Sequence, residues 1–370
     1  MAQEFDIAVL GATPAGYAAA YSLAREGRQV ILLDAPGQPS ESTLADWTPR
    51  EFFDIPGLPK GLEKDCSAKA FKQVVYHNSD LTKQVEYSTR AAIGYFLNVK
   101  DLLASFRRKA VAAGVKMRSC HARPQVRLLE DHVDLLSSPP ARARLLLIAH
   151  NTPREAVTEL ALQGQHLPQP PMVVVALDVP MGAAAKPLQG ALHVIQSRDR
   201  SDLGMFLAAG GQLHIRMISA SVASGTRVAE LSGLVAKLQR VGIAPGNLPL
   251  SKAVGAVWYP PAGMALELET HVAKRCMLIG TAGGFAESIT GQTLYPSIKS
   301  AIIAADIAQA ALDHAHTQDE LMKYKTLWRK NLADYLRPPN TSLQMLLPLL
   351  FVNQQIVAKF TKALLFGESI

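Results

Sequence analysis

A glycine-containing turn close to the start of the chain has residues suited to binding a phosphate. The turn reads Gly11-Ala12-Thr13-Pro14-Ala15-Gly16, and an acid, Asp34, follows about twenty residues later. Glycines let the backbone approach a phosphate, and the N–H groups at the start of a following helix attract its negative charge. A carboxylate at this spacing accepts hydrogen bonds from a ribose. The pattern predicts a dinucleotide site formed by Gly11, Thr13, Pro14, Ala15, Gly16 and Asp34.

The segments around this turn are those of a dinucleotide-binding βαβ unit. Residues 5–10 predict a strand, residues 17–23 an alanine-rich helix, and residues 29–33 a second strand. Gly11 permits the tight turn, and Gly16 lets the helix pack closely on the strand. The alternative is an ordinary strand–helix turn without a ligand. The strand, helix and acid in the required order favour the dinucleotide site.

Composition and charge limit the classes of protein to be considered. The 370 residues, with 48% hydrophobic and 19% charged side chains, predict a globular protein of one large or two medium domains. The net charge of +7 is not gathered in long blocks, so we expect no nucleic-acid partner. Three cysteines without CxxC spacing, and histidines without HxxxH spacing, predict neither a disulfide framework nor a metal site.

The chain also lacks the patterns of secreted and membrane-spanning proteins. Glu4 and Asp6 stand where a signal peptide would be cationic, and no run reaches the roughly 18 apolar residues of a membrane span. Unpaired cysteines fit a reducing compartment. We therefore expect a cytoplasmic protein, with membrane association as an alternative that depends on its C-terminal end.

The rest of the chain predicts an α/β fold in which a second region interrupts the first. After an irregular excursion at 35–59, we expect a helix at 97–114, strands at 115–120 and 144–149, and a hairpin at 124–138. Apolar runs between 172 and 219 predict an antiparallel sheet, followed by an amphipathic helix at 227–241. A strand at 275–279, a second glycine turn at 280–285 and helices at 296–312 and 319–335 return to the first region. The predicted division is 1–154 with 266–335, then 155–265 as a substrate domain, and 336–370 as a helical C-terminal extension.

Together these features resemble the FAD-dependent oxidoreductases of the hydroxybenzoate-hydroxylase fold. The GxxPAG turn, the antiparallel middle region and the late strand–glycine turn–helix are most similar to the geranylgeranyl-reductase-like group, over residues 5–330. The first turn looks like a GGTPAG variant in which threonine stands in the middle, as Thr13 does here. The resemblance implies FAD as cofactor, held by a Rossmann-like domain into which an antiparallel-sheet substrate domain is inserted.

A second family motif, LIGDAAGF followed by TGxG, is similar to Leu278–Leu294. By that likeness Gly280, Thr281, Gly283, Gly291 and Leu294 would line the flavin, and the start of the helix near Pro296 would stabilise negative charge on it. The sequence departs from the family pattern at five places. Thr281 replaces the acid, Thr293 the second glycine, Ser288 the proline, and Ala149-His150-Asn151 the ADG sequence, and Val99 or Lys100 stands where the family has an arginine before the helix that contains Leu102.

The resemblance implies flavin hydride chemistry on a hydrophobic substrate, for which isoprenoids and lipids are candidates. A flavin-dependent monooxygenase is one alternative. The other is a non-catalytic flavoprotein-like protein that binds a lipid or a partner. No second Rossmann unit for NAD(P)H is visible, so we expect a nicotinamide to bind transiently or a protein to deliver the electrons. The catalytic residues stay open: Tyr295 is a candidate proton donor beside Thr290 and Gln292, with a packing role favoured for it, and a structural role is favoured for His214.

The C-terminal stretch 343–366 is unusually apolar. Its apolar residues recur at helical spacing, with Lys359 and Lys362 on another side. Three interpretations are open: peripheral contact with a membrane, a cover over a lipid-sized pocket, or a helix pair packed on the core.

Overall fold

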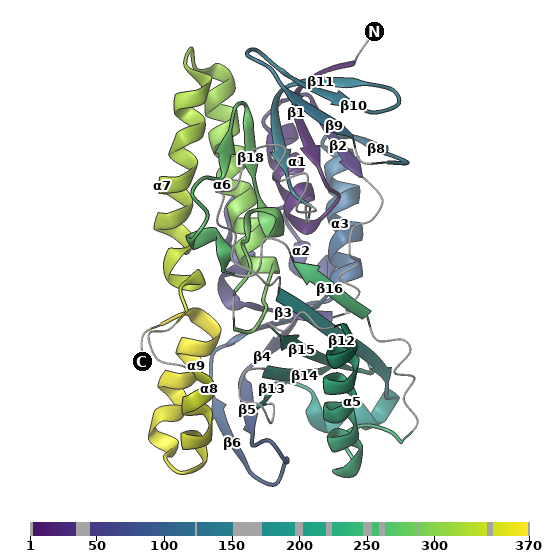
Figure 1. The fold of residues 1–370 in the computed structure, drawn as a ribbon. Coiled ribbons are helices and arrows are strands. Elements are labelled where there is room, and N and C mark those ends of the chain that lie inside the picture. Colours follow the sequence, from purple (N-terminus) through teal and green to yellow (C-terminus); the bar gives the residue numbers. More distant parts are fainter. Residues whose placement is uncertain are drawn as a thin grey trace.

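An eight-stranded sheet with helices packed against it forms one end of the molecule in the computed structural model (Figure 1). The structure describes residues 3–34, 45–122, 124–150, 172–196, 203–219, 224–246, 254–258, 263–287, 289–338 and 343–368. The sheet has the strand order β17-β18-β11-β1-β2-β8, and a hairpin of β9 and β10 pairs with β11. The bounds are β1 (Gln3–Leu10), β2 (Val30–Asp34), β8 (Lys116–Ser119), β9 (Gln125–Leu128), β10 (Val133–Leu136), β11 (Ala141–Ile148), β17 (Val272–Ala273) and β18 (Cys276–Leu278).

The central strands of this sheet run parallel, as a Rossmann-like domain requires. β1 lies parallel to β2 and β11, β2 to β8, and β11 to β18. The apolar residues of β1, β2, β11 and β18 are buried on both faces, which explains the continuous apolar runs in the sequence. All five central strands therefore end at one edge, where the loops that follow β1 and β18 lie beside each other.

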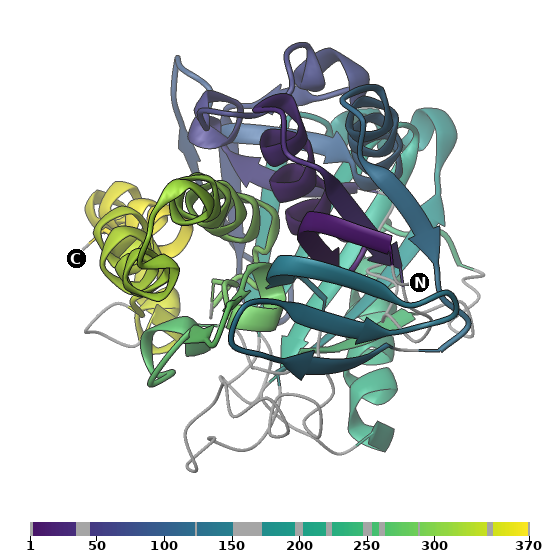
Figure 2. The same ribbon diagram turned by 90° about the horizontal axis from the view of Figure 1, so that it is seen from above.

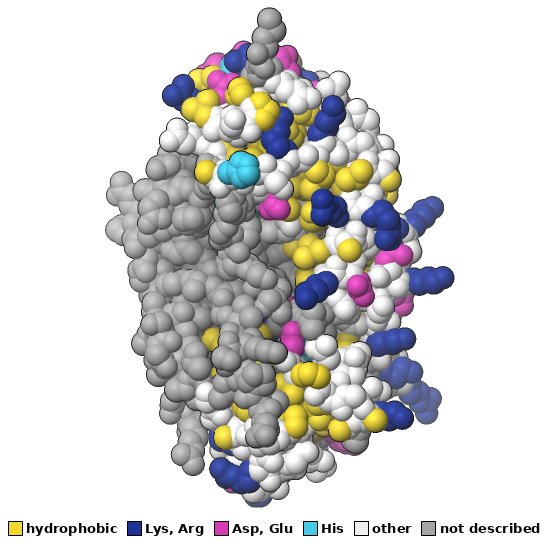
Figure 3. Space-filling model, turned by 90° about the vertical axis from the view of Figure 1, so that its right-hand side faces the viewer, with side chains coloured by type: hydrophobic (Ala, Val, Ile, Leu, Met, Phe, Trp, Pro, Cys, Tyr) yellow, Lys and Arg dark blue, Asp and Glu magenta, His cyan; other side chains and the backbone are white. Residues whose placement is uncertain are grey.

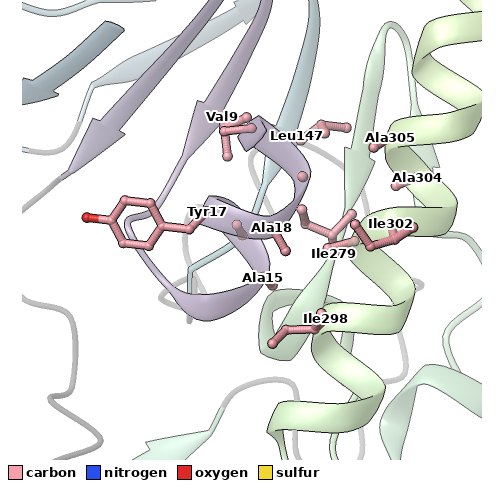
Figure 4. Close-up of a cluster of buried hydrophobic side chains, with 14 of the residues drawn as sticks. Val9, Ala15, Tyr17, Ala18, Leu147, Ile279, Ile298, Ile302, Ala304 and Ala305 are labelled. Carbon is pink, nitrogen blue, oxygen red and sulfur yellow. The ribbon is translucent and has the colours of Figure 1, made fainter. Parts of the chain in front are cut away.

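Helices α1 (Pro14–Arg25), α2 (Leu62–Asp65), α3 (Val99–Ala112), α6 (Leu294–Asp313) and α7 (Thr317–Leu336) accompany this sheet. Small side chains allow a close approach: Ala15 and Ala18 of α1 face Ile298 and Ile302 of α6, as Figure 4 shows. Figure 2 shows α6, α7 and the yellow C-terminal helices together on one side of the strands. The packing of α1 on α6 joins an early and a late part of the sequence in one hydrophobic core.

The second sheet has seven strands in the order β16-β12-β15-β14-β13-β5-β6. The bounds are β5 (Gln73–His77), β6 (Gln84–Ser88), β12 (Met172–Pro180), β13 (Ala191–Gln196), β14 (Leu203–Ala209), β15 (Gln212–Ser219) and β16 (Val254–Trp258). Its pairs are antiparallel, as predicted, except that β13 and β5 are parallel. Helix α5 (Ser224–Arg240) covers one face, where Leu231, Leu234 and Leu238 pack.

A three-stranded sheet of β3 (Ala45–Pro49), β7 (Gly94–Asn98) and β4 (Lys69–Phe71) completes the strands. The C-terminal stretch is not one helix but α8 (Leu343–Leu346), two 3-10 turns (347–351 and 354–356) and α9 (Val357–Phe366). One side of it packs on the core beside β5 and β6: Phe360 stacks edge-on against Tyr76, whose hydroxyl donates to Thr361 Oγ1 at 2.7 Å.

Most predicted elements are confirmed to within a few residues, with three differences. The described part of the excursion predicted as irregular at 35–59 contains β3 and a 3-10 turn (Arg50–Asp54), because residues 45–49 pair with β7, far along the chain. The helix predicted from Pro296 begins at Leu294, so proline occupies its third position, where the missing N–H costs nothing. Strands β5 and β6 come from residues 73–88 yet pair in the second sheet. The division of the chain into domains therefore stays a prediction.

The described surface is mixed in charge. Figure 3 shows lysine and arginine side chains spread along one edge of that face, with acidic side chains between them. None of the helices in the described ranges is long and apolar enough to cross a bilayer. Across the same residues, no three His, Cys, Asp or Glu side chains gather as metal ligands would.

Candidate functional site

The first glycine turn links the end of β1 to the start of α1 and leaves no room for larger residues. Gly11 has φ of +120°, and its N–H donates to the Leu33 carbonyl at 2.8 Å. A Cβ atom on Gly11 would lie 2.7 Å from His150 Cβ, and one on Gly16 would lie 2.0 Å from the Gly11 carbonyl oxygen. The backbone can follow this path only with glycine at both positions.

Thr13 holds this turn in place. Its hydroxyl donates to the Ala149 carbonyl at 2.8 Å and accepts the Gly16 N–H at 3.1 Å, so the threonine caps α1 and ties it to the end of β11. Pro14 stands at the first helical position, where its fixed φ suits the helix. The first turn of α1, Pro14–Tyr17, carries no charged side chain to compete with an anion at the positive end of the helix dipole.

Asp34 ends β2 next to this turn. Its carbonyl accepts the Cys120 N–H at 2.7 Å, which fixes the strand end against β8. Burial raises the pKa of the Asp34 carboxyl, and Arg107 acts in the opposite direction. The same arginine and the Asp34 carboxylate also act on Tyr17, whose pKa burial raises. The acid predicted to hold a ribose therefore lies half-buried beside the turn, within the field of a cation.

The second glycine turn, at the end of β18, packs directly on the first. Gly280 has φ of +61°, and a Cβ atom there would lie 2.7 Å from the Cβ of Ala15. The Gly280 N–H donates to Ser300 Oγ of α6 at 3.0 Å. Thr281 is buried, and a Cβ on Gly283 would lie 2.7 Å from the ring of Phe285. Two predicted halves of one site, from distant parts of the sequence, are thus in contact.

The segment between the second turn and α6 is held by Glu287, a residue that the sequence analysis did not single out. Its carboxylate accepts the Ile289 N–H at 2.9 Å and both the N–H and hydroxyl of Thr290 at 2.6 Å. Gly291 follows with φ of +64°, and Leu294 begins α6 as a buried residue. The sequence signal for this role was an acid three residues before Thr290, because a side-chain acceptor at this spacing caps a turn.

Gln292 connects this segment to its surroundings. Its amide donates to the Trp47 carbonyl at 3.2 Å and accepts hydrogen bonds from the Tyr295 N–H and the Tyr335 hydroxyl, each at 3.3 Å. Burial raises the pKa of Tyr335 well above its ordinary value, and the nearby Glu287 carboxylate adds to this. Tyr335 therefore stays protonated and donates.

Tyr295 lies in a cleft of about 490 Å³ beside α7 and α9. Its hydroxyl accepts a hydrogen bond from Lys299 at 3.0 Å, and its ring packs edge-on against Tyr335. The cleft is lined in part by Tyr87, Ile93 and Phe366. The predicted proton donor thus faces an amphipathic cleft, and Tyr335 connects that cleft to Gln292.

A second polar group lies on the face of the seven-stranded sheet that is turned toward β3. His214 Nδ1 lies 2.6 Å from an Asp178 carboxylate oxygen, and Arg216 Nη2 donates to Asp46 at 2.9 Å. His214 and Arg216 alternate on β15 with Leu213 and Ile215, which pack on the opposite face with α5. Asp46, Trp47, His214 and Arg216 line a cavity of about 20 Å³.

The histidine–carboxylate pair could not be found from the sequence. Asp178 and His214 meet because β12 and β15 pair in a register that places them opposite each other. The favoured structural role of His214 stays a prediction, and a buried histidine oriented by a carboxylate is also suited to proton transfer. Trp47, which lines the same cavity as His214, accepts a hydrogen bond through its carbonyl from Gln292, in the segment between the second turn and α6.

The predicted site residues fall into one row along the strand ends. Asp34 ends β2, Gly11–Gly16 follow β1, and Gly280, Thr281 and Gly283 follow β18. Gly291 and Leu294 lie at the start of α6. His150 lies directly under Gly11, where the family pattern has an acid. Asn151 and Ser288 lie outside the described residues, as do residues 35–44 of the predicted excursion.

The sequence matches no family model and no curated protein. Among solved structures, a geranylgeranyl bacteriochlorophyll reductase-like protein from Thermoplasma acidophilum is 13% identical, over 90% of this chain and 84% of that chain, with a TM-score of 0.75. FqzB is 15% identical, over 100% of this chain and 96% of that chain, with a TM-score of 0.73. PqsL from Pseudomonas aeruginosa, described as a probable FAD-dependent monooxygenase, is 18% identical, over 97% of this chain and 100% of that chain, with a TM-score of 0.67. The likeness confirms the predicted α/β fold, a Rossmann-like domain combined with a second sheet.

Proposed function

We propose that this chain binds FAD and is an FAD-dependent oxidoreductase. The observation that carries the proposal is the contact between Gly280 and Ala15, because it joins the two glycine turns along one row of strand ends. FAD carries adenosine at one end, the flavin at the other and the pyrophosphate between them, so its site must be divided in this way. The residues fit this group: the uncharged first turn of α1 suits the pyrophosphate, and Asp34 suits the ribose.

The flavin end of the proposed site lies at the start of α6. The first turn of α6, Leu294–Ser297, is uncharged and buried, so its dipole would stabilise negative charge on a reduced ring. Thr281, at the position of the family acid, offers a hydroxyl in place of a carboxylate. FAD, when bound, supplies the hydride chemistry. The chain's own contribution is to bind and orient it, to exclude water, and to move a proton at the His214 imidazole.

We further propose a hydrophobic substrate, with isoprenoids and lipids as the favoured class. The amphipathic cleft beside Tyr295 has an apolar part to receive it, formed with Tyr87, Ile93 and Phe366, and Tyr335 connects this cleft to the flavin end. Charged side chains also line the cleft: Arg50, Glu51, Asp334, Lys362 and Glu368. The likeness to a protein of the geranylgeranyl reductase-like kind points in the same direction. A flavin-dependent monooxygenase is the second candidate, and the likeness to PqsL is the observation that favours it.

Absorbance of the purified protein tests the cofactor. We expect a yellow protein whose flavin is released on denaturation. Colourless protein that takes up no added FAD would contradict the proposal and favour a non-catalytic lipid- or partner-binding role. Oxygen consumption by the reduced, FAD-loaded protein in the presence of substrate then separates the two chemistries. Substrate-dependent oxygen uptake indicates a monooxygenase, and anaerobic turnover indicates a reductase.

A further inference from the structure

The C-terminal segment has a second apolar face that points into solvent. Leu343, Leu347 and Leu350 are buried against the core. Met345 and Leu349 lie between them in the sequence and Val352 follows, and these three side chains are 69%, 48% and 85% exposed. Their spacing of four and three residues places them in one stripe on the outer side of α8 and the turn that follows. A segment that needed only to cover the core would have polar residues on this side.

The location of this stripe leaves it open to a large partner. The C-terminal helices form a projection at the lower left of the molecule beside β6 (Figure 1). Val352 is the most exposed of the large hydrophobic side chains in the described residues. The uncharged polar side chains of Asn353, Gln354 and Gln355 follow it, also exposed. The outer stripe (Met345, Leu349 and Val352) is therefore at the surface of the projection.

The charge around the outer stripe suits an anionic surface. No Asp or Glu occurs in the sequence from residue 335 to 367, a stretch that contains Arg337, Lys359 and Lys362. Lys359 is exposed near the start of α9, and Lys362 is half exposed and lies 3.5 Å from Glu368. Exposed apolar side chains in a stretch whose charged residues are basic, with Glu368 at its end beside Lys362, are typical of segments that lie in the interface of a bilayer.

The size of the outer stripe argues against a second copy of the chain as its partner. A stable protein interface buries about 800 Å² on each side, which needs on the order of twenty residues. Three exposed apolar side chains make a much smaller patch, but a few such side chains suffice to enter the headgroup region of a membrane. We propose that Met345, Leu349 and Val352 insert into the surface of an anionic bilayer and that Lys359 contacts its headgroups. This goes beyond the proposed function and does not depend on it.

Sedimentation of the purified full chain with vesicles tests this proposal. We expect the protein to bind vesicles of phosphatidylcholine with phosphatidylglycerol more strongly than vesicles of phosphatidylcholine alone. The triple variant Met345→Ser, Leu349→Ser, Val352→Ser should bind about tenfold more weakly, since partition follows the apolar area that is buried. Lys359→Gln should reduce the preference for the anionic vesicles.

A matched control uses apolar side chains that are exposed elsewhere. Met322 and Leu327 on α7 are 54% and 39% exposed, so Met322→Ser with Leu327→Ser should leave vesicle binding unchanged. Equal loss in both variants, or no binding of the wild type to either vesicle, would overturn the proposal. Analytical ultracentrifugation tests the alternative partner, a second copy of the chain. A dimer that the triple variant abolishes would show a second copy on this face and would also overturn it.

Discussion

Ala15 and Gly280 are packed so closely that a single added carbon would bring two Cβ atoms to 2.7 Å. Ala15 belongs to the first turn of α1, and Gly280 begins the turn after β18. The contact fixes the second turn against the start of α1, which we assign to the pyrophosphate of FAD. It also means that the cofactor site depends on a steric relationship between residues far apart in the sequence.

Gly280→Ala should therefore weaken flavin binding by separating the turns. We expect a loss of flavin retention of at least about tenfold and a lower melting temperature, because the new methyl group overlaps Ala15 and φ of +61° is unfavourable for alanine. Flavin absorbance per mole of purified protein measures the effect.

The double variant Gly280→Ala with Ala15→Gly separates packing from backbone strain. Removing the Ala15 methyl group restores the space, so flavin content should recover in part, leaving only the backbone cost of about 1 kcal/mol. If the double variant is as impaired as the single one, contact between the turns is not the cause of the loss.

Gly11→Ala tests whether the first glycine turn holds the pyrophosphate of FAD. A Cβ there would overlap His150 Cβ at 2.7 Å, so we expect a protein with little or no bound flavin. Gly27→Ala is the matched control, because Gly27 also has positive φ, +87°, but nothing lies within 4 Å of its added Cβ. Circular dichroism shows whether both variants fold. Full flavin content in folded Gly11→Ala would show that this turn does not hold the cofactor.

The sequence predicts best the parts of this fold that are local. The strand, glycine turn, helix and acid from Phe5 to Asp34 could be found because each element leaves its own pattern within a few residues. The parallel pairing of β5 with β13 could not be found, because it depends on contacts between Val75 and His193, far apart in the chain. The sheet membership of residues 73–88 was missed for this reason.

The same distinction explains which site residues were missed. Glu287 caps its turn through local contacts, but the family motif indicates only the glycines of this segment and gives no role to the acid. Asp178 and His214 become a pair only through strand register, and a one-residue slip would place them on opposite faces. Tyr335 reaches Gln292 only because α7 packs on α6. Such contacts leave no pattern in a single sequence.

His214→Gln tests the proton-transfer role. We expect turnover to fall by about 100-fold, the size of effect that general acid–base residues have, with flavin content unchanged. Asp178→Asn should cause a smaller loss, because the imidazole remains but is no longer oriented by a carboxylate. Arg216→Lys serves as a control for general disturbance of the same sheet face. Turnover of His214→Gln equal to that of the wild type would return the histidine to a structural role.

Stability should fall in mild acid because of a histidine that supports the second turn. His271 is buried, its Nε2 lies 2.9 Å from the Gly283 carbonyl, and burial lowers its pKa from 6.5 to about 4. The unfolded chain therefore binds a proton that the folded chain does not between these values. The free energy of unfolding should be highest above pH 6.5 and should decrease toward pH 4, with at most about 3 kcal/mol due to His271. His77 and His193, whose pKa values burial lowers to about 4 and about 3, add to the slope.

Urea unfolding at a series of pH values measures this dependence of the free energy of unfolding on pH. His271→Gln keeps a donor for Gly283 but cannot titrate, so it should make the curve shallower without removing the slope. An unchanged slope would mean that His271 is not protonated on unfolding in this range.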